Sequence, residues 1–222
     1  MSNGNVFQRW QSRVEKGLLR LIEMPLPPEK SGRYRETLER SRNLLKLKAP
    51  MSRLFNSLGE LSLRLGFQIL SIVLLRRAEN IDPKDPLPKI NLSRAQLSLA
   101  NRFFLRAPKS GAVSYNLQNG NKRLDQLIQR RTLPESKLVE VTLLRRRIED
   151  RLEMWKDVRR GELEPGEIKE ILLKEDEQLR QVQIRKIPSV AELEKLEPRR
   201  VGFYYREYRE EQLKRKEKRH RK

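Results

Sequence analysis

The segment "TLPESKLVEVTLLRRRIEDRLEMWKDVRRGELEPGE", residues 132–167, decides the fold predicted for this chain. Its first four residues form a capping box from Thr132 to Glu135, with Pro134 in the first helical turn. An apolar seam at heptad-like spacing follows, and "GELEPGE" at 161–167 is typical of a turn into a return helix. We therefore predict an αα-hairpin over about residues 132–187. The seam contains Leu138, Val141, Ile148, Leu152 and Trp155.

The remaining sequence also favours helices, which prolines separate. Residues 6–22 predict an amphipathic helix, and "RYRETLERSRNLLKLK" at 33–48 predicts a second. The most apolar stretch, 51–77, carries a strand-like alternation over 61–69 together with a helical seam, and its length favours one buried helix. The predicted fold class is mainly α: an extended, non-compact helical protein with one αα-hairpin, proline-rich connectors and a basic C-terminal helix or tail.

Proline and glycine also suggest the domain boundaries. "NIDPKDPLPKINLS", from residue 80, has three prolines and predicts an extended linker over 80–92. A short helix over 93–105 and a Gly/Asn/Ser-rich loop over 106–123 follow, with Asn119–Gly120 as the turn signal. We predict an N-terminal helical module, the linker, a helical module with the hairpin, and the basic tail. Their bounds are 1–79, 80–92, 93–201 and 202–222.

Composition restricts the function. The 222 residues include 50 Lys and Arg against 30 Asp and Glu, so the formal net charge is +20, and the excess is present in both halves. Such a chain favours a polyanionic partner, because binding releases counterions. The sequence has no cysteine and a single histidine, His220, which argues against thiol chemistry, zinc sites and Ser-His triads. No catalytic motif is present and most carboxylates neighbour Lys or Arg, so we predict no enzyme activity, cofactor or metal.

Four basic segments are candidates for contacts with RNA phosphates. Tyr115 is a further candidate, because it can stack on an unpaired base, although local packing explains it slightly better. For the arginine run at 130–131 and 145–147, a solvated outer face of the helix is an equally good explanation. The N-terminal face has Arg9, Arg13, Lys16 and Arg20, and the 102–123 segment has Arg102, Arg106, Lys109, Lys122 and Arg123. The run has Arg130, Arg131, Arg145, Arg146 and Arg147, and the tail has Lys214, Arg215, Lys216, Lys218, Arg219, Arg221 and Lys222.

A second group of residues is predicted to dock protein: Leu138, Ile148, Leu152, Trp155, Tyr204 and Tyr208. The tail "GFYYREYREEQLKRKEKRHRK" at 202–222 divides accordingly. Its tyrosines predict a helix that docks on protein. From Lys214 on, the lack of apolar residues predicts disorder in the free chain and ordering on a polyanion.

The composition and layout resemble those of ribosomal proteins. We therefore predict a structural RNA-binding subunit of a ribonucleoprotein particle, expected to be a mitochondrial ribosomal protein that neutralises rRNA phosphates and bridges neighbouring proteins. The alternatives are a helical protein–protein adaptor or ribosome assembly factor, and a peripheral membrane protein that uses residues 6–22. Residues 1–22 suggest the mitochondrion, whereas "KRKEKRHRK" at 214–222 resembles a nuclear or nucleolar signal.

Overall fold

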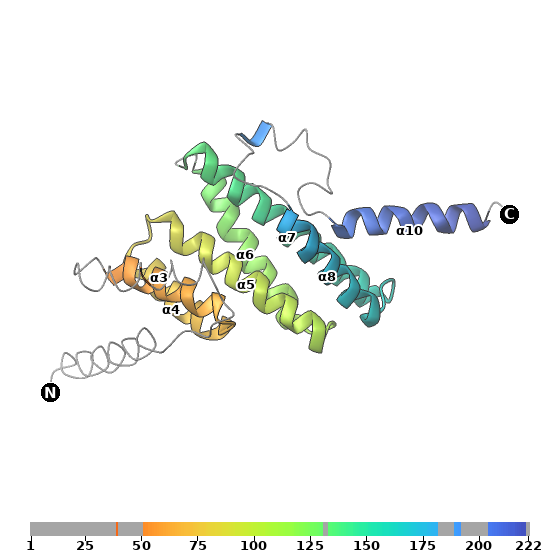
Figure 1. The fold of residues 1–222 in the computed structure, drawn as a ribbon, viewed down its shortest axis with the longest axis horizontal. Coiled ribbons are helices and arrows are strands. Elements are labelled where there is room, and N and C mark those ends of the chain that lie inside the picture. Colours follow the sequence, from red (N-terminus) through yellow and green to blue (C-terminus); the bar gives the residue numbers. More distant parts are fainter. Residues whose placement is uncertain (1–38, 40–50, 131–132, 182–188, 192–203, 221–222) are drawn as a thin grey trace. The chain divides into compact units, whose positions relative to one another are not determined.

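The computed structural model describes residues 39, 51–130, 133–181, 189–191 and 204–220, and confirms the mainly α fold (Figure 1). A division between Pro88 and Lys89 separates two compact units. The helices predicted over 6–22 and 33–48 lie outside the described residues. The helices of the described part are α3 (Met51–Arg64), α4 (Gln68–Ile81), α5 (Pro86–Arg106), α6 (Gly111–Gln129), α7 (Glu135–Arg160), α8 (Pro165–Gln181) and α10 (Tyr204–His220).

The described part of the first unit is a pair of helices, α3 and α4. Helix rather than strand is confirmed for 61–64 and for 68 onward, but the prediction of one continuous helix over 51–77 is wrong. The chain turns at Gly66, whose φ of 84° lies in the left-handed region where a side chain would strain the backbone. The turn folds α4 back on α3, and their facing leucines form a small core. That core contains Leu54, Phe55, Leu58, Leu61, Leu74 and Ala78.

The two helices approach closely at Gly59. A Cβ atom built on Gly59 would lie 2.5 Å from Leu75 Cγ, and Leu75 is fully buried. The Ser71 hydroxyl donates a hydrogen bond of 2.7 Å to the Gly59 carbonyl, which ties the helices at the same level. Only a residue without a side chain fits this contact.

Gly59→Val is therefore expected to destabilise the α3–α4 pair by about 1–3 kcal/mol, because the added carbons overpack a closed interface. Amide hydrogen exchange measured on peptides within 51–81 reports this pair separately from the second unit. Gly111→Val is the matched control, since no atom lies within 4 Å of its Cβ position. Unchanged exchange over 51–81 in the Gly59 variant would contradict the close contact.

The second unit begins within α5, and here the predicted linker is wrong in its second half. Helix α5 starts at Pro86, and Lys89, Ile90 and Leu92 are buried. Proline suits the first helical turn, where its missing amide hydrogen has no helical partner. The Asp85 carboxylate accepts a hydrogen bond of 2.9 Å from the Leu87 amide, which caps the helix start. Only the short turn at 82–85 separates α4 from α5.

The predicted loop over 106–123 is also wrong, because residues 111–129 form helix α6. Ser110 caps it by accepting a hydrogen bond from the Ala112 amide at 3.2 Å. Gly120 lies in the middle of the helix, where Ser93 Oγ of α5 donates to its carbonyl at 3.1 Å. A Cβ on Gly120 would lie 3.0 Å from Ile148 Cδ1 of α7. This glycine therefore allows close helix packing and makes no turn; the loop is restricted to 107–110.

Helices α7 and α8 occupy the region of the predicted hairpin. Gly161, with a φ of 77°, ends α7, and Pro165 begins α8 four residues later. Apolar side chains from α5 to α8 form one core, together with Tyr205 of α10. Thr132 of the predicted capping box lies outside the described residues. Within the described part, no helix is long and apolar enough to cross a membrane.

Candidate nucleic-acid interface

Basic side chains from three segments meet at one end of the second unit. Trp155 Nε1 of α7 donates to the Ser110 carbonyl at 3.2 Å, and Arg159 donates to the Lys109 carbonyl at 3.5 Å. These bonds attach the last turns of α7 to the 107–110 loop, which follows the C-terminus of α5. The exposed cations gathered here are called the basic end. Its residues are Arg102, Arg106, Lys109, Arg159 and Arg160.

The electrostatics of the basic end favour an anion. Within the described residues, none of Arg106, Lys109 and Arg159 pairs with a carboxylate. The Arg159 guanidinium lies 5.6 Å from the centre of the Trp155 ring, which orients it without neutralising it. Nearby Lys156 donates to Glu153 at 2.7 Å, and this hydrogen bond lowers the pKa of Glu153. The sequence prediction included Arg102, Arg106 and Lys109 and missed Arg159 and Arg160, which only tertiary packing brings beside them.

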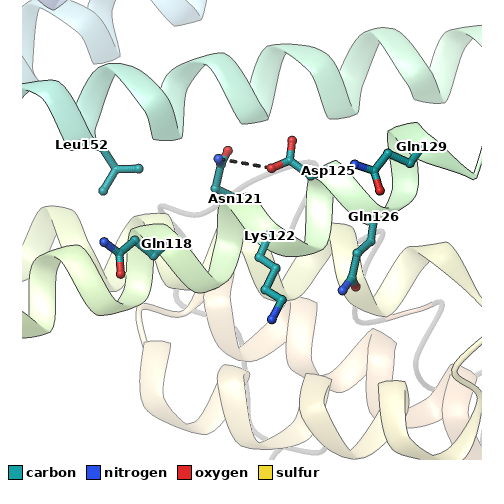
Figure 2. A pocket seen from close by; sticks show the side chains of 7 residues that line it. All are labelled: Gln118, Asn121, Lys122, Asp125, Gln126, Gln129 and Leu152. Atoms are coloured by element: carbon teal, nitrogen blue, oxygen red, sulfur yellow. Dashed lines mark hydrogen bonds between the residues drawn. The ribbon is translucent and has the colours of Figure 1, made fainter.

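Helix α6 continues from the basic end and carries further predicted site residues. Tyr115, Lys122 and Arg130 are exposed, whereas Arg123 is half-buried and donates to Gln96 Oε1 at 3.2 Å. A shallow groove of about 390 Å³ runs along α6 beside Leu152 of α7 (Figure 2). Its lining is mostly polar: Gln118, Asn121, Lys122, Asp125, Gln126 and Gln129.

The predicted arginine run at 145–147 is placed largely among acidic side chains. Arg145 pairs with Asp125 at 2.5 Å and with Glu149 at 3.0 Å. Arg147 pairs with Glu175 of α8 at 3.2 Å. The pairs with Asp125 and Glu175 connect α7 to α6 and α8, and the pair with Glu149 lies within α7, so phosphate would have to compete with carboxylates of the same chain. At the basic end, Arg106, Lys109 and Arg159 have no such competition within the described residues, whereas Arg160 lies 3.9 Å from Asp157.

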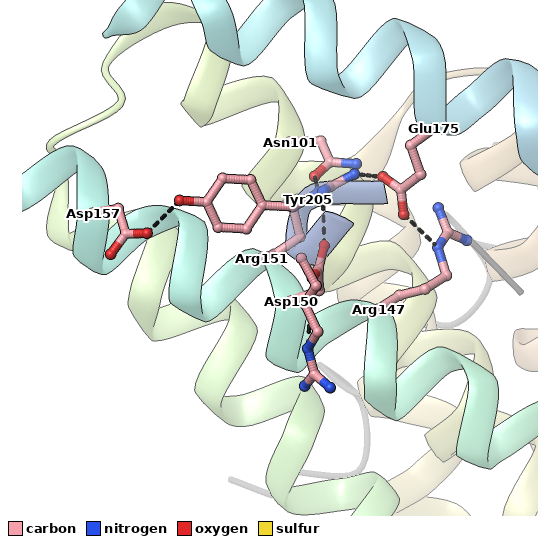
Figure 3. Close-up of polar contacts among 8 residues, drawn as sticks. Asn101, Arg147, Asp150, Arg151, Asp157, Glu175 and Tyr205 are labelled. Carbon is pink, nitrogen blue, oxygen red and sulfur yellow. Dashed lines mark hydrogen bonds and ion pairs between the residues drawn. The ribbon is translucent and has the colours of Figure 1, made fainter. Parts of the chain in front are cut away.

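The structure contains a buried ionic cluster that the sequence reading missed (Figure 3). Arg151 is only 1% exposed, yet it pairs with Glu175 and donates to Asn101 Oδ1 at 3.1 Å. Asp150 is fully buried, and its carboxylate lies 3.8 Å from the Arg151 guanidinium. Carboxylates that neighbour Lys or Arg in the sequence are expected to form ion pairs on solvated helix faces, and for these three residues that expectation is wrong. The available signal was the position of Arg151, three residues from both Ile148 and Met154 in the apolar stripe of α7.

The N-terminal half of α10 docks on this cluster and on α8. The buried Tyr205 hydroxyl donates to Asp157, and the Tyr208 hydroxyl donates to Glu167. Burial and the bond to Asp157 raise the pKa of Tyr205, so the hydroxyl stays a donor. Arg209 lies 3.3 Å from Asp157 and Arg206 lies 3.8 Å from Asp150. These tyrosines therefore hold the tail helix to the protein's own helices.

Two expectations about the tail and docking residues need correction. The predicted disorder from Lys214 on is wrong, since α10 continues to His220. Ile148 is fully buried and belongs to the core, so it offers no docking surface. Leu138, Leu152 and Trp155 are half-buried, and Lys214 is exposed. The residues Arg9, Arg13, Lys16, Arg20, Arg131, Arg221 and Lys222, and the side chains of Tyr204, Arg215, Lys216, Lys218 and Arg219, lie outside the described part.

Among the described residues, no group of three or more acidic or histidine side chains could hold a metal ion. No family model, curated protein or solved structure matches this chain. The function must therefore be argued from the site itself.

Proposed function

We propose that this protein is a structural RNA-binding subunit of a ribonucleoprotein particle. The observation that carries the proposal is the basic end, where exposed cations from α5, the 107–110 loop and α7 gather, and where Arg106, Lys109 and Arg159 pair with no carboxylate of the described residues. Phosphate groups need only such cations within reach, and each neutralised phosphate releases counterions into solution. The formal net charge of +20 extends the same attraction over the whole chain.

The particle is expected to be a mitochondrial ribosome, in which α10 and the groove beside α7 would face RNA or neighbouring proteins. The mitochondrial location rests on the basic amphipathic pattern of residues 6–22, and the nucleolus is the alternative. The mitochondrial ribosome, the mitochondrial location and a bridging contact with proteins of the same particle stay predictions.

RNA binding is expected to weaken steeply with salt. The triple variant Arg106→Gln, Lys109→Gln, Arg159→Gln should bind a structured RNA at least tenfold more weakly at about 0.1 M salt, because three phosphate contacts are lost. The plot of log affinity against log salt should become shallower by about 2–3. Fluorescence anisotropy of a labelled RNA, titrated at several salt concentrations, measures both quantities.

The matched control is Arg53→Gln, Lys84→Gln, Lys169→Gln, which removes the same charge from exposed residues outside the five that define the basic end. It should leave the affinity within about threefold of the unmodified chain, since only a long-range charge effect remains. Equal loss in both triple variants would place binding elsewhere. Salt-independent binding by the unmodified protein would contradict the mechanism.

A helical adaptor is the second candidate, and one observation favours it. Helix α4 and the residue before it expose a contiguous apolar face at Phe67, Ile69, Leu70 and Val73, of a kind that protein interfaces cover. The same RNA titration separates the candidates: an adaptor whose contacts are all with protein would show no RNA binding with a steep salt slope.

A further inference from the structure

We infer that the outer face of α6 binds single-stranded RNA through its bases. This deepens the proposed function and rests on it, since it adds base contacts to the phosphate contacts at the basic end. The α6 face is defined by Tyr115, Gln118, Lys122, Gln126 and Gln129, all of which are exposed.

The periodicity of α6 separates this face cleanly from the core. Positions 115, 118, 122, 126 and 129 recur every three or four residues, so they lie on one side of the helix. The opposite side packs into the core of the second unit through Val113, Leu117, Leu124 and Leu127. Substitutions on the α6 face therefore leave the core contacts of the helix intact.

The groove beside this face has a size suited to small planar groups. Its volume of about 390 Å³ lies within the range of small-molecule sites, about 300–1,000 Å³. Figure 2 shows Gln118 near Leu152, with Asn121 and Asp125 on the α7 side and Lys122 and Gln126 on the other. A groove with one apolar side chain, Leu152, and amide groups along its length can contact a base by its face and its edge.

Asn121 supplies the second observation that points to a ligand. Its Nδ2 donates to Asp125 at 3.5 Å, whereas its buried Oδ1 has no hydrogen-bond partner. A buried acceptor without a donor is unfavourable by about 1–3 kcal/mol, which favours a turn of the Asn121 side chain into the groove, where an N–H group of a ligand can donate to Oδ1. The exocyclic amino groups of adenine, cytosine and guanine are such donors, and carboxamides both donate and accept at base edges.

Tyr115 and Lys122 supply the remaining two contacts that a single strand needs. Tyr115 is 59% exposed at the end of α6 next to the 107–110 loop, so its ring is open for a base to stack on. Lys122 is exposed seven residues further along α6, where it can reach a phosphate. The one acidic residue of α6, Asp125, is paired with Arg145 at 2.5 Å and does not repel the backbone.

The exposed amides and the tyrosine ring favour a single strand over a duplex. In A-form RNA the bases are stacked on one another, and the major groove is too deep and narrow for side chains to read. An unpaired strand can instead lay its bases on Tyr115 and against the amides while its phosphates reach the basic end.

The test uses the full chain and two RNA probes of equal length and charge, an unstructured 12-mer containing 2-aminopurine and a hairpin. Tyr115→Ala should weaken binding of the 12-mer about tenfold, by loss of one stacked base, and abolish quenching of the 2-aminopurine. Hairpin binding and the salt slope should stay unchanged, because no charge is removed. Tyr115→Phe should retain both the affinity and the quenching.

Phe67→Ala is the matched control, since it removes a ring that is 55% exposed in the first unit. Gln118→Ala with Gln126→Ala should weaken the 12-mer severalfold and spare the hairpin. If the unmodified chain prefers the hairpin, or Tyr115→Ala leaves 12-mer binding and quenching intact while the salt slope is steep, the α6 inference is wrong and the proposed function stands. Absence of RNA binding by the unmodified chain would overturn both.

Discussion

Replacing Arg151 with alanine is expected to lower the free energy of unfolding of the second unit by about 3–5 kcal/mol. The guanidinium is 1% exposed, and it is the cation that faces both Glu175 and Asp150. Its removal leaves these carboxylates buried with less compensating charge and leaves Asn101 Oδ1 without the hydrogen bond it accepts. Breaking a buried pair from one side is far more damaging than losing an exposed one.

Chemical denaturation followed by Trp155 fluorescence measures this effect, in a background where the second tryptophan, Trp10, is phenylalanine. Lys156→Ala is the control on the same helix, because its ion pair with Glu153 is exposed and is expected to contribute less than about 1 kcal/mol. The double variant Arg151→Met, Glu175→Leu should recover part of the loss, because the buried guanidinium and the buried Glu175 carboxylate are removed together. A change below about 1 kcal/mol for Arg151→Ala would contradict the buried cluster.

Protonation of Asp150 is expected to add stability to the second unit as the pH falls from 7 to 4. Burial raises the pKa of this carboxyl to about 6, against the opposing effects of Arg151, Arg206 and the first amides of α10. The folded state therefore binds a proton more tightly than the unfolded state. The added stability is complete below the unfolded pKa of about 4 and is lost as the pH rises through 6.

The expected size is on the order of 3 kcal/mol in full and about 1 kcal/mol between pH 7 and pH 5. Comparison of denaturation curves for the unmodified chain and for Asp150→Asn isolates this contribution, since the amide does not titrate. The difference between the two free energies should change across pH 4–6 and stay constant above pH 7. Parallel pH profiles would show that Asp150 is hydrated in the folded protein.

Helices were predictable from the sequence where prolines mark the ends of a long periodic stretch, as in α7 and α8. Local signals misled where tertiary packing decides the backbone. Asn119–Gly120 is a turn signal, yet Gly120 lies in a helix. Its lack of a side chain lets α5 and α7 pack closely against α6 at this position. The prolines over 80–92 predict an extended linker, although the Asp85 carboxylate and the burial of Ile90 make Pro86 a helix start.

The candidate site was predictable only in part, for the same reason. Arg106, Lys109 and Tyr115 were named from charge and chemistry, which a sequence displays directly. Arg159 joined them because Trp155 and Arg159 bond to the 107–110 loop, a contact across about fifty residues. The groove residues Gln118 and Asn121 were missed because a segment assigned to a loop has no face on which to place them.

The contact between Tyr205 and Asp157 also sets an order in time. The two residues are 48 positions apart, so at about 5–20 residues per second a ribosome makes Asp157 roughly 2–10 seconds before Tyr205. During that interval α7 exists without the helix that covers Asp150 and Asp157, and both acids remain hydrated. The nascent second unit can therefore acquire its core from α5 to α8 first, and it completes its buried polar contacts only when α10 emerges.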